Sequence, residues 1–112
     1  MIYRHDQAHD YYILDDARKP QPVSVTEWAS WLKANTATCL LGDERIGRRR
    51  VRTVFHGHDP DVRLNRTLTP RLWSTLFYAS PDDLLSTSGH TTEATASQFH
   101  ARLVAVLSGP QS

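Results

Sequence analysis

The sequence predicts an α+β fold, a single domain in which an antiparallel sheet of four to five strands packs against two helices. Residues 44–59 alternate apolar and polar side chains beyond a glycine, as the turn and second strand of a β-hairpin do. Residues 24–35 and 92–107 carry apolar side chains at helical spacing behind capping residues. At 112 residues, the chain can bury one modest core. We therefore expect one domain over residues 11–108.

The predicted elements follow one another in the order β-α-β-β-β-(β)-α. Residues 11–14 (YYIL) are aromatic and β-branched and predict a first strand, after which Pro20 and Pro22 predict irregular structure. Ser24 and Glu27 have the spacing of a capping box, so a helix should begin here. Its apolar stripe is formed by Val25, Trp28, Ala29 and Leu32.

The central segment of the chain predicts the hairpin. Residues 36–41 (TATCLL) favour a strand that leads into it, and Gly47 marks its turn. Beyond the turn, Val51, Thr53 and Phe55 form one face of a strand. The opposite face of that strand carries Arg50, Arg52, Val54 and His56.

The last part of the chain predicts two more strands and a helix. Residues 72–78 (LWSTLFY) are apolar on both faces and predict a central strand, and 80–83 predict a turn before a short edge strand at 84–88. Thr91 or Thr92 can cap the final helix. Its apolar stripe should contain Ala96, Phe99, Leu103 and Val106 or Leu107.

Composition excludes several classes of protein. The 13 Lys+Arg residues and 12 Asp+Glu residues give a net charge of +1, which excludes a globally acidic mimic of nucleic acid and a globally basic coat. A single cysteine excludes an internal disulfide framework and a multi-cysteine zinc site, so we expect a reducing, cytoplasmic setting. The first ten residues have no apolar run, so we expect a flexible arm at 1–10, a tail at 109–112, and no membrane segment.

A cluster of arginines is the main candidate for binding a partner. Guanidinium groups bind carboxylates and phosphates through several donors, so a hairpin end rich in arginine can bind an acidic protein or a nucleic acid. Trp31 lies at the margin of the first helix's apolar stripe, where an exposed aromatic side chain could also anchor a partner. The candidate partner-binding residues are Arg45, Arg48, Arg49, Arg50, Arg52 and Trp31.

Histidines and aspartates near the end of the hairpin offer a second, metal-based hypothesis. On a strand His56 and His58 point to the same side, and Asp59 could complete a ligand set for a small metal-dependent hydrolase. The packed thiol predicted for Cys39 is not an activated nucleophile. We therefore predict no catalytic residue and no cofactor, and keep three functions open: a protein-binding protein, a nucleic-acid-binding protein and, third, this hydrolase. An exposed sheet edge would also allow a homodimer.

Several motifs together resemble a family of small uncharacterised proteins carried by bacteriophages and prophages. These motifs are YYILDD, PVSVTEWASWL, ERIG with RVRTVFHG, LWSTLFYAS and TTEATASQFHARLVAVL. The matching positions are Ser24, Glu27, Trp28, Ala29, Ile46, Gly47, Val51, Thr53, Val54, Phe55, Gly57, Leu72, Thr75, Thr92, His100 and Ala101. His56, His58 and residues 1–10 depart from the pattern.

The resemblance implies a phage-related protein in the cytoplasm of a bacterial host cell. Small phage proteins often act by binding a host component. The leading expectation is therefore an interaction protein that binds a host protein or protein–RNA complex, such as an anti-CRISPR-like inhibitor of a bacterial defence system.

Overall fold

The computed structural model describes residues 11–60 and 69–109 and confirms the α+β prediction. The predicted arm at 1–10 and most of the predicted tail lie outside the described residues. The elements are β1 (Tyr11–Leu14), β2 (Pro20–Val23), α2 (Val25–Ala34), α3 (Thr36–Cys39), β3 (Leu40–Ile46), β4 (Arg49–Phe55), β5 (Trp73–Ser80), β6 (Asp83–His90) and α5 (Glu93–Ser108).

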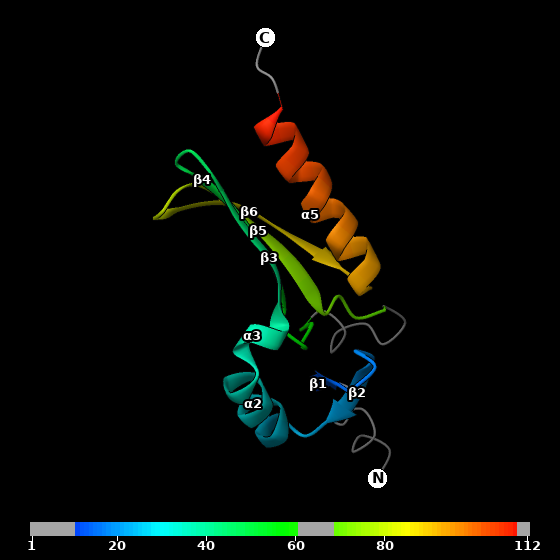
Figure 1. Cartoon of the computed structure of the whole chain (residues 1–112). Coiled ribbons are helices and arrows are strands. Elements are labelled where there is room, and N and C mark those ends of the chain that lie inside the picture. Colours follow the sequence, from blue (N-terminus) through cyan, green and yellow to red (C-terminus); the bar gives the residue numbers. More distant parts are fainter. Residues whose placement is uncertain (1–10, 61–68, 110–112) are drawn as a thin grey trace.

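The larger of two antiparallel sheets has the strand order β3-β4-β5-β6. Helix α5 lies along one face of this sheet, while β1, β2, α2 and α3 lie beyond the end of the sheet that is far from the β3–β4 turn (Figure 1). The β3–β4 hairpin has the predicted turn, in which Gly47 has a φ of 65°. The predicted alternation in β4 is also present, because Val51, Thr53 and Phe55 are all buried.

The segment that contains the two prolines forms a strand instead of irregular structure. Strand β2 pairs with β1, with Pro20 opposite Leu14 and Pro22 opposite Tyr12. Prolines two residues apart both lack the backbone N–H on the same side of a strand, so an edge strand can turn that side away from its partner. The prolines therefore allow β2 to form, but only as an edge strand.

Residues 36–39 form the short helix α3 where a strand was predicted. The Thr36 hydroxyl donates to the carbonyls of Leu32 and Lys33, and the Cys39 amide donates to the carbonyl of Asn35. These local bonds extend the end of α2 and outweigh the strand propensity of the segment. Strand β3 therefore begins at Leu40.

Helix α2 begins and ends where predicted, with Ser24 Oγ accepting from the Glu27 amide at 3.1 Å. No residue of α2 is fully buried, and the helix packs mainly against β1. It reaches the larger sheet through the ring of Trp31, whose centroid lies 6.0 Å from that of Phe55. The core that this contact joins contains Leu14, Cys39, Phe55, Leu72, Trp73 and Ala96.

Helix α5 keeps most of its predicted apolar stripe, since Phe99, Leu103 and Leu107 are half-buried. Ala96 is buried as predicted, but the other buried residue is His100, and Val106 is 68% exposed. Gly42 of β3 makes this orientation possible, because a Cβ atom there would lie 2.6 Å from His100 Nε2. The hydrogen bonds of His100 described below determine which side of the helix faces the sheet.

Candidate functional site

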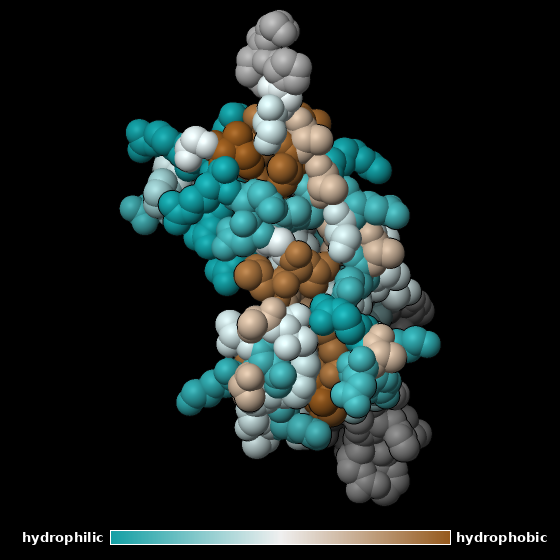
Figure 2. Space-filling view, in the orientation of Figure 1, coloured by the Kyte–Doolittle hydropathy of each residue, from teal (hydrophilic) through white to brown (hydrophobic). Residues whose placement is uncertain are grey.

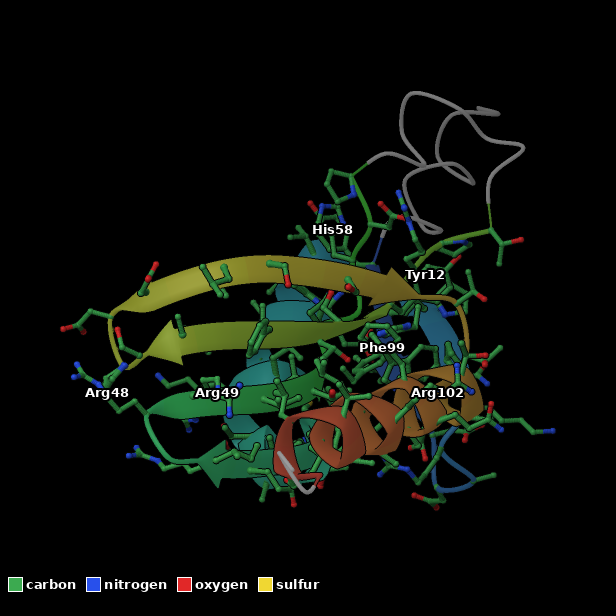
Figure 3. All side chains as sticks on the ribbon, turned by 90° about the horizontal axis from the view of Figure 1, so that it is seen from above. Tyr12, Arg48, Arg49, His58, Phe99 and Arg102 are labelled. Carbon is green, nitrogen blue, oxygen red and sulfur yellow. The ribbon has the colours of Figure 1, made fainter. Side chains whose placement is uncertain are left out.

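The two sets of residues singled out from the sequence lie at opposite ends of the larger sheet. Arg48 lies at the β3–β4 turn, whereas His58 lies at the far end near Tyr12 (Figure 3). Hydrophilic side chains gather on the surface at the hairpin end, at the upper left of Figure 2. The two sets therefore cannot form one site.

The hairpin end carries a shallow pocket of about 260 Å³. The pocket is lined by Pro81, in the β5–β6 turn, and by Arg45, Gly47, Arg48, Arg49 and Arg50. Cross-strand pairing places Arg45 directly opposite Arg50, an arrangement of like charges that is unfavourable by itself. The pocket is therefore a concentrated source of guanidinium donors.

The arginines of the hairpin have different local partners. Arg50 forms a two-pronged ion pair with Asp43, with N···O distances of 2.7 and 2.5 Å, and this guanidinium lowers the pKa of the Asp43 carboxyl. Arg49 donates to the carbonyl of Leu107 near the end of α5 at 3.4 Å. Within the described part of the chain, Arg45 and Arg48 form no ion pair.

Trp31 is half-buried and is placed against the core by its edge-on contact with Phe55. It lies in α2, away from the hairpin pocket (Figure 1). The structure therefore does not bring Trp31 together with the arginines.

His56, His58 and Asp59 each contact a different neighbour. Nδ1 of His56 accepts from the His58 amide at 3.4 Å, and Nε2 of the same ring lies 2.8 Å from Ser74 Oγ. The imidazole of His58 stacks on the ring of Tyr11 at 4.5 Å.

Asp59 is buried and accepts from the backbone N–H of Arg71 at 2.9 Å. Among the residues that the structure describes, no group of three His, Cys, Asp or Glu side chains is placed to hold a metal ion. The residues of the metal hypothesis thus take part in contacts that join the segment after β4 to β1, through His58, and to β5 and the residues before it, through His56 and Asp59.

A hydrogen-bonded chain beneath α5 was not predicted from the sequence. Glu44 contacts Nε2 of His100, and Nδ1 of the same ring lies 2.7 Å from Thr53 Oγ1. Thr53 Oγ1 lies 2.7 Å from Thr75 Oγ1, which in turn lies 3.0 Å from Nε2 of His90. The chain takes one residue from each strand of the larger sheet and one from α5, and so runs from edge to edge.

The chain is almost wholly inaccessible to solvent. Thr53 is 0% and Thr75 1% exposed, whereas the side chain of Glu44 is half-exposed at the sheet edge. Burial lowers the pKa of His90, so the neutral ring is favoured. A threonine hydroxyl enclosed in this way has no access to a substrate, so the chain is a structural contact between helix and sheet. Threonines on the apolar face of two neighbouring strands were the signal in the sequence for this chain.

Cys39 is a buried thiol, as expected, and burial raises its pKa. No helix in the described ranges is both long and apolar enough to span a membrane. Comparison with family models, with curated proteins and with solved structures finds no match to this chain.

Proposed function

We propose that this chain is a binding protein without catalytic activity that recognises an acidic protein partner through the arginine-lined end of its hairpin. The observation that supports the proposal is the pocket formed by Arg45, Arg48, Arg49 and Arg50 beside Pro81. Guanidinium groups form two-pronged hydrogen bonds with carboxylates, and arginine is enriched at protein interfaces. An acidic side chain in this pocket would also relieve the repulsion between Arg45 and Arg50.

The local charge supports an acidic partner. Asp43 is bound to Arg50, and Asp82 and Asp83 of the neighbouring turn form no ion pair with these arginines in the described structure. Arg45 and Arg48 are exposed, so their guanidinium groups are available to a partner. Such charges chiefly increase the association rate and the specificity of a complex.

The biological setting of the proposal comes from the resemblance to small phage and prophage proteins. It suggests that the acidic partner is a protein of a bacterial host, and that binding inhibits a host defence component in the manner of an anti-CRISPR protein. A protein–RNA complex with an acidic protein surface would offer the same chemistry.

The proposal is tested by capture of partners from bacterial cells with the tagged wild-type protein, followed by mass spectrometry. The double variant Arg45→Glu/Arg48→Glu should lose the specific partner, because both exposed cations are reversed. Arg102→Glu is the matched control, since Arg102 is an exposed arginine on α5. Retention of every partner by the double variant would refute the arginine assignment.

Nucleic acid is the alternative ligand for the same arginines. A nuclease-sensitive capture whose yield falls steeply as salt rises would favour it over a protein partner, because phosphate contacts release counterions.

A further inference from the structure

The larger sheet has one face that no described element covers. Helix α5 covers the face that carries Thr53, while α2 and α3 lie beyond the end of the sheet (Figure 1). The uncovered side is called the open face below. Cross-strand partners point to the same side of a sheet, so the register identifies its residues.

The open face changes from charged to apolar from β3 to β6. Two neighbouring rows of cross-strand partners show this change. In that strand order they are Arg45, Arg50, Tyr78 and Leu84, and then Asp43, Arg52, Leu76 and Thr87. Leu84 is 48% exposed, although it is a large apolar side chain. A partner that complements the open face must therefore be acidic where it meets β3 and β4 and apolar where it meets β5 and β6.

Arg52 lies on this face and has a side-chain donor without a hydrogen-bond acceptor in the described structure. Asp43 lies directly opposite Arg52 in the register but forms its ion pair with Arg50. The Nε atom of Arg52 is buried and has no hydrogen-bond partner among the described residues. A buried donor without an acceptor is unfavourable, and a carboxylate placed on the open face would give the half-buried side chain of Arg52 an acceptor for its guanidinium.

We propose that the open face binds a segment of an acidic protein, with its carboxylates on Arg52 and Arg45 and its apolar side chains over Leu76, Tyr78 and Leu84. This inference rests on the proposed function and adds the surface and the pattern of the partner. Nucleic acid fits less well, because phosphates would contact the arginines and leave the leucines uncovered.

A second copy of this chain also matches the open face poorly. The only carboxylate in the two rows is that of Asp43, which Arg50 already binds. Two open faces packed together would therefore bring arginines of both copies close to one another, and juxtaposed like charges oppose association.

The probe is a synthetic amphipathic peptide with glutamates on one side and leucines on the other, and a peptide with lysines in place of the glutamates is its control. Amide shifts in ¹⁵N NMR spectra of the whole chain should concentrate on the open-face residues of β4, β5 and β6. Arg52→Gln and Leu84→Glu should each raise the Kd about tenfold, the typical effect of losing an interface anchor. Val106→Glu, which changes an exposed apolar residue on α5, should leave the Kd unchanged.

Three results would overturn the inference: no binding of the glutamate peptide, equal binding of the lysine peptide, or full affinity in Leu84→Glu. A dimer of the free protein that Leu84→Glu dissociates would also overturn it by assigning the face to a second copy. The capture experiment separates the two proposals. If Arg45→Glu/Arg48→Glu loses the cellular partner but Leu84→Glu and Arg52→Gln retain it, the hairpin binds the partner and the open face does not.

Discussion

Hydroxyl and imidazole groups form a hydrogen-bonded chain between α5 and the larger sheet, and the donors and acceptors of this chain can all be matched. In the tautomer of His100 that carries its proton on Nε2, the ring donates to Glu44 and accepts a hydrogen bond from Thr53 at Nδ1. Thr53 then accepts from Thr75, which accepts from Nε2 of His90. Each hydroxyl donates once and accepts once, so the removal of either hydroxyl takes one hydrogen bond from each of its two neighbours.

Thr75→Val tests this chain at a single residue. Valine keeps the shape of threonine but removes the hydroxyl, so Nε2 of His90 and Oγ1 of Thr53 each lose a hydrogen bond. The free energy of unfolding in urea should fall by about 1–3 kcal/mol, the cost of leaving buried polar groups unpaired. Thr87→Val on the open face is the control and should change it by about 0.5 kcal/mol or less. Equal effects of the two variants would contradict the role of the chain.

Gly42→Ala tests the close approach of α5 to β3. An added Cβ atom would lie 2.6 Å from Nε2 of His100, so the buried ring would have to move away from Glu44 and Thr53. We expect a loss of about 1–3 kcal/mol in unfolding free energy, as for other overpacked positions.

The double variant Gly42→Ala/His100→Ala isolates this steric effect, because it removes the ring that the new methyl group meets. Its loss of stability should be clearly smaller than the sum of the two single losses. Additive losses would show that Gly42 is needed for another reason.

At the scale of the element, helix α2 is stabilised by its cap in addition to the packing of Trp31 and Leu32 against the core, since none of its residues is fully buried. Ser24→Ala removes the oxygen that accepts from the Glu27 amide and should lower the unfolding free energy by about 1 kcal/mol. Ser30→Ala within the same helix should be neutral or slightly stabilising, because alanine has the higher helix propensity. Circular dichroism during urea unfolding measures both, and a loss in Ser30→Ala as large as in Ser24→Ala would rule out the cap as the cause.

Elements fixed by local chemistry were predictable from the sequence. Ser24 and Thr92 cap the helices as expected, and Gly47 lies in the hairpin turn. Elements that depend on distant partners were not predictable. Strand β2 forms because β1 lies beside it, and the polar His100 is buried between α5 and the sheet because its ring meets Thr53, a residue 47 positions away in sequence.

The candidate site was likewise predictable only where it depends on residues that are close in the sequence. The turn and the alternation of β4 were both predicted, so the sequence alone predicted that Arg45, Arg48 and Arg50 lie close together at the hairpin end. The contribution of Pro81 to their pocket depends on the pairing of β4 with β5, and so does the open face. Nothing in the sequence indicated that Asp43 would form its ion pair with Arg50 and not with Arg52, the residue directly opposite it.

At the scale of the whole molecule, the segment from β1 to α3 is joined to the larger sheet by the shared core and by a few directed contacts. The Tyr12 amide donates to the carbonyl of Gly57 at 2.8 Å, and the indole N–H of Trp28 donates to the carbonyl of His56 at 2.9 Å. The Nε–H group of Arg18 donates to both carboxylate oxygens of Glu93, at the first turn of α5. The His56 ring lies at this junction, and the His90 ring lies beneath α5. Proton binding to the two rings should therefore weaken the packing of both the β1–α3 segment and α5 on the larger sheet.

Stability should therefore fall in mildly acidic solution. Burial lowers the pKa of both His56 and His90 below the ordinary value of 6.5. As the pH falls below that value, the unfolded chain binds more protons than the folded chain, so the free energy of unfolding decreases. The lowered pKa of Asp43 acts in a separate and more acidic range, below its ordinary value of 3.8.

Urea unfolding at a series of pH values from about 7.5 to 5 measures the effect of the two histidines. The wild-type protein should lose stability across this range, and His56→Gln/His90→Gln should show a flatter profile, because glutamine keeps a polar side chain at each position but does not titrate. The slope of the profile separates proton linkage from simple damage to packing, since a packing defect lowers the whole curve without changing its slope. A wild-type profile that is flat or rises towards pH 5 would show that these buried rings do not couple folding to protonation.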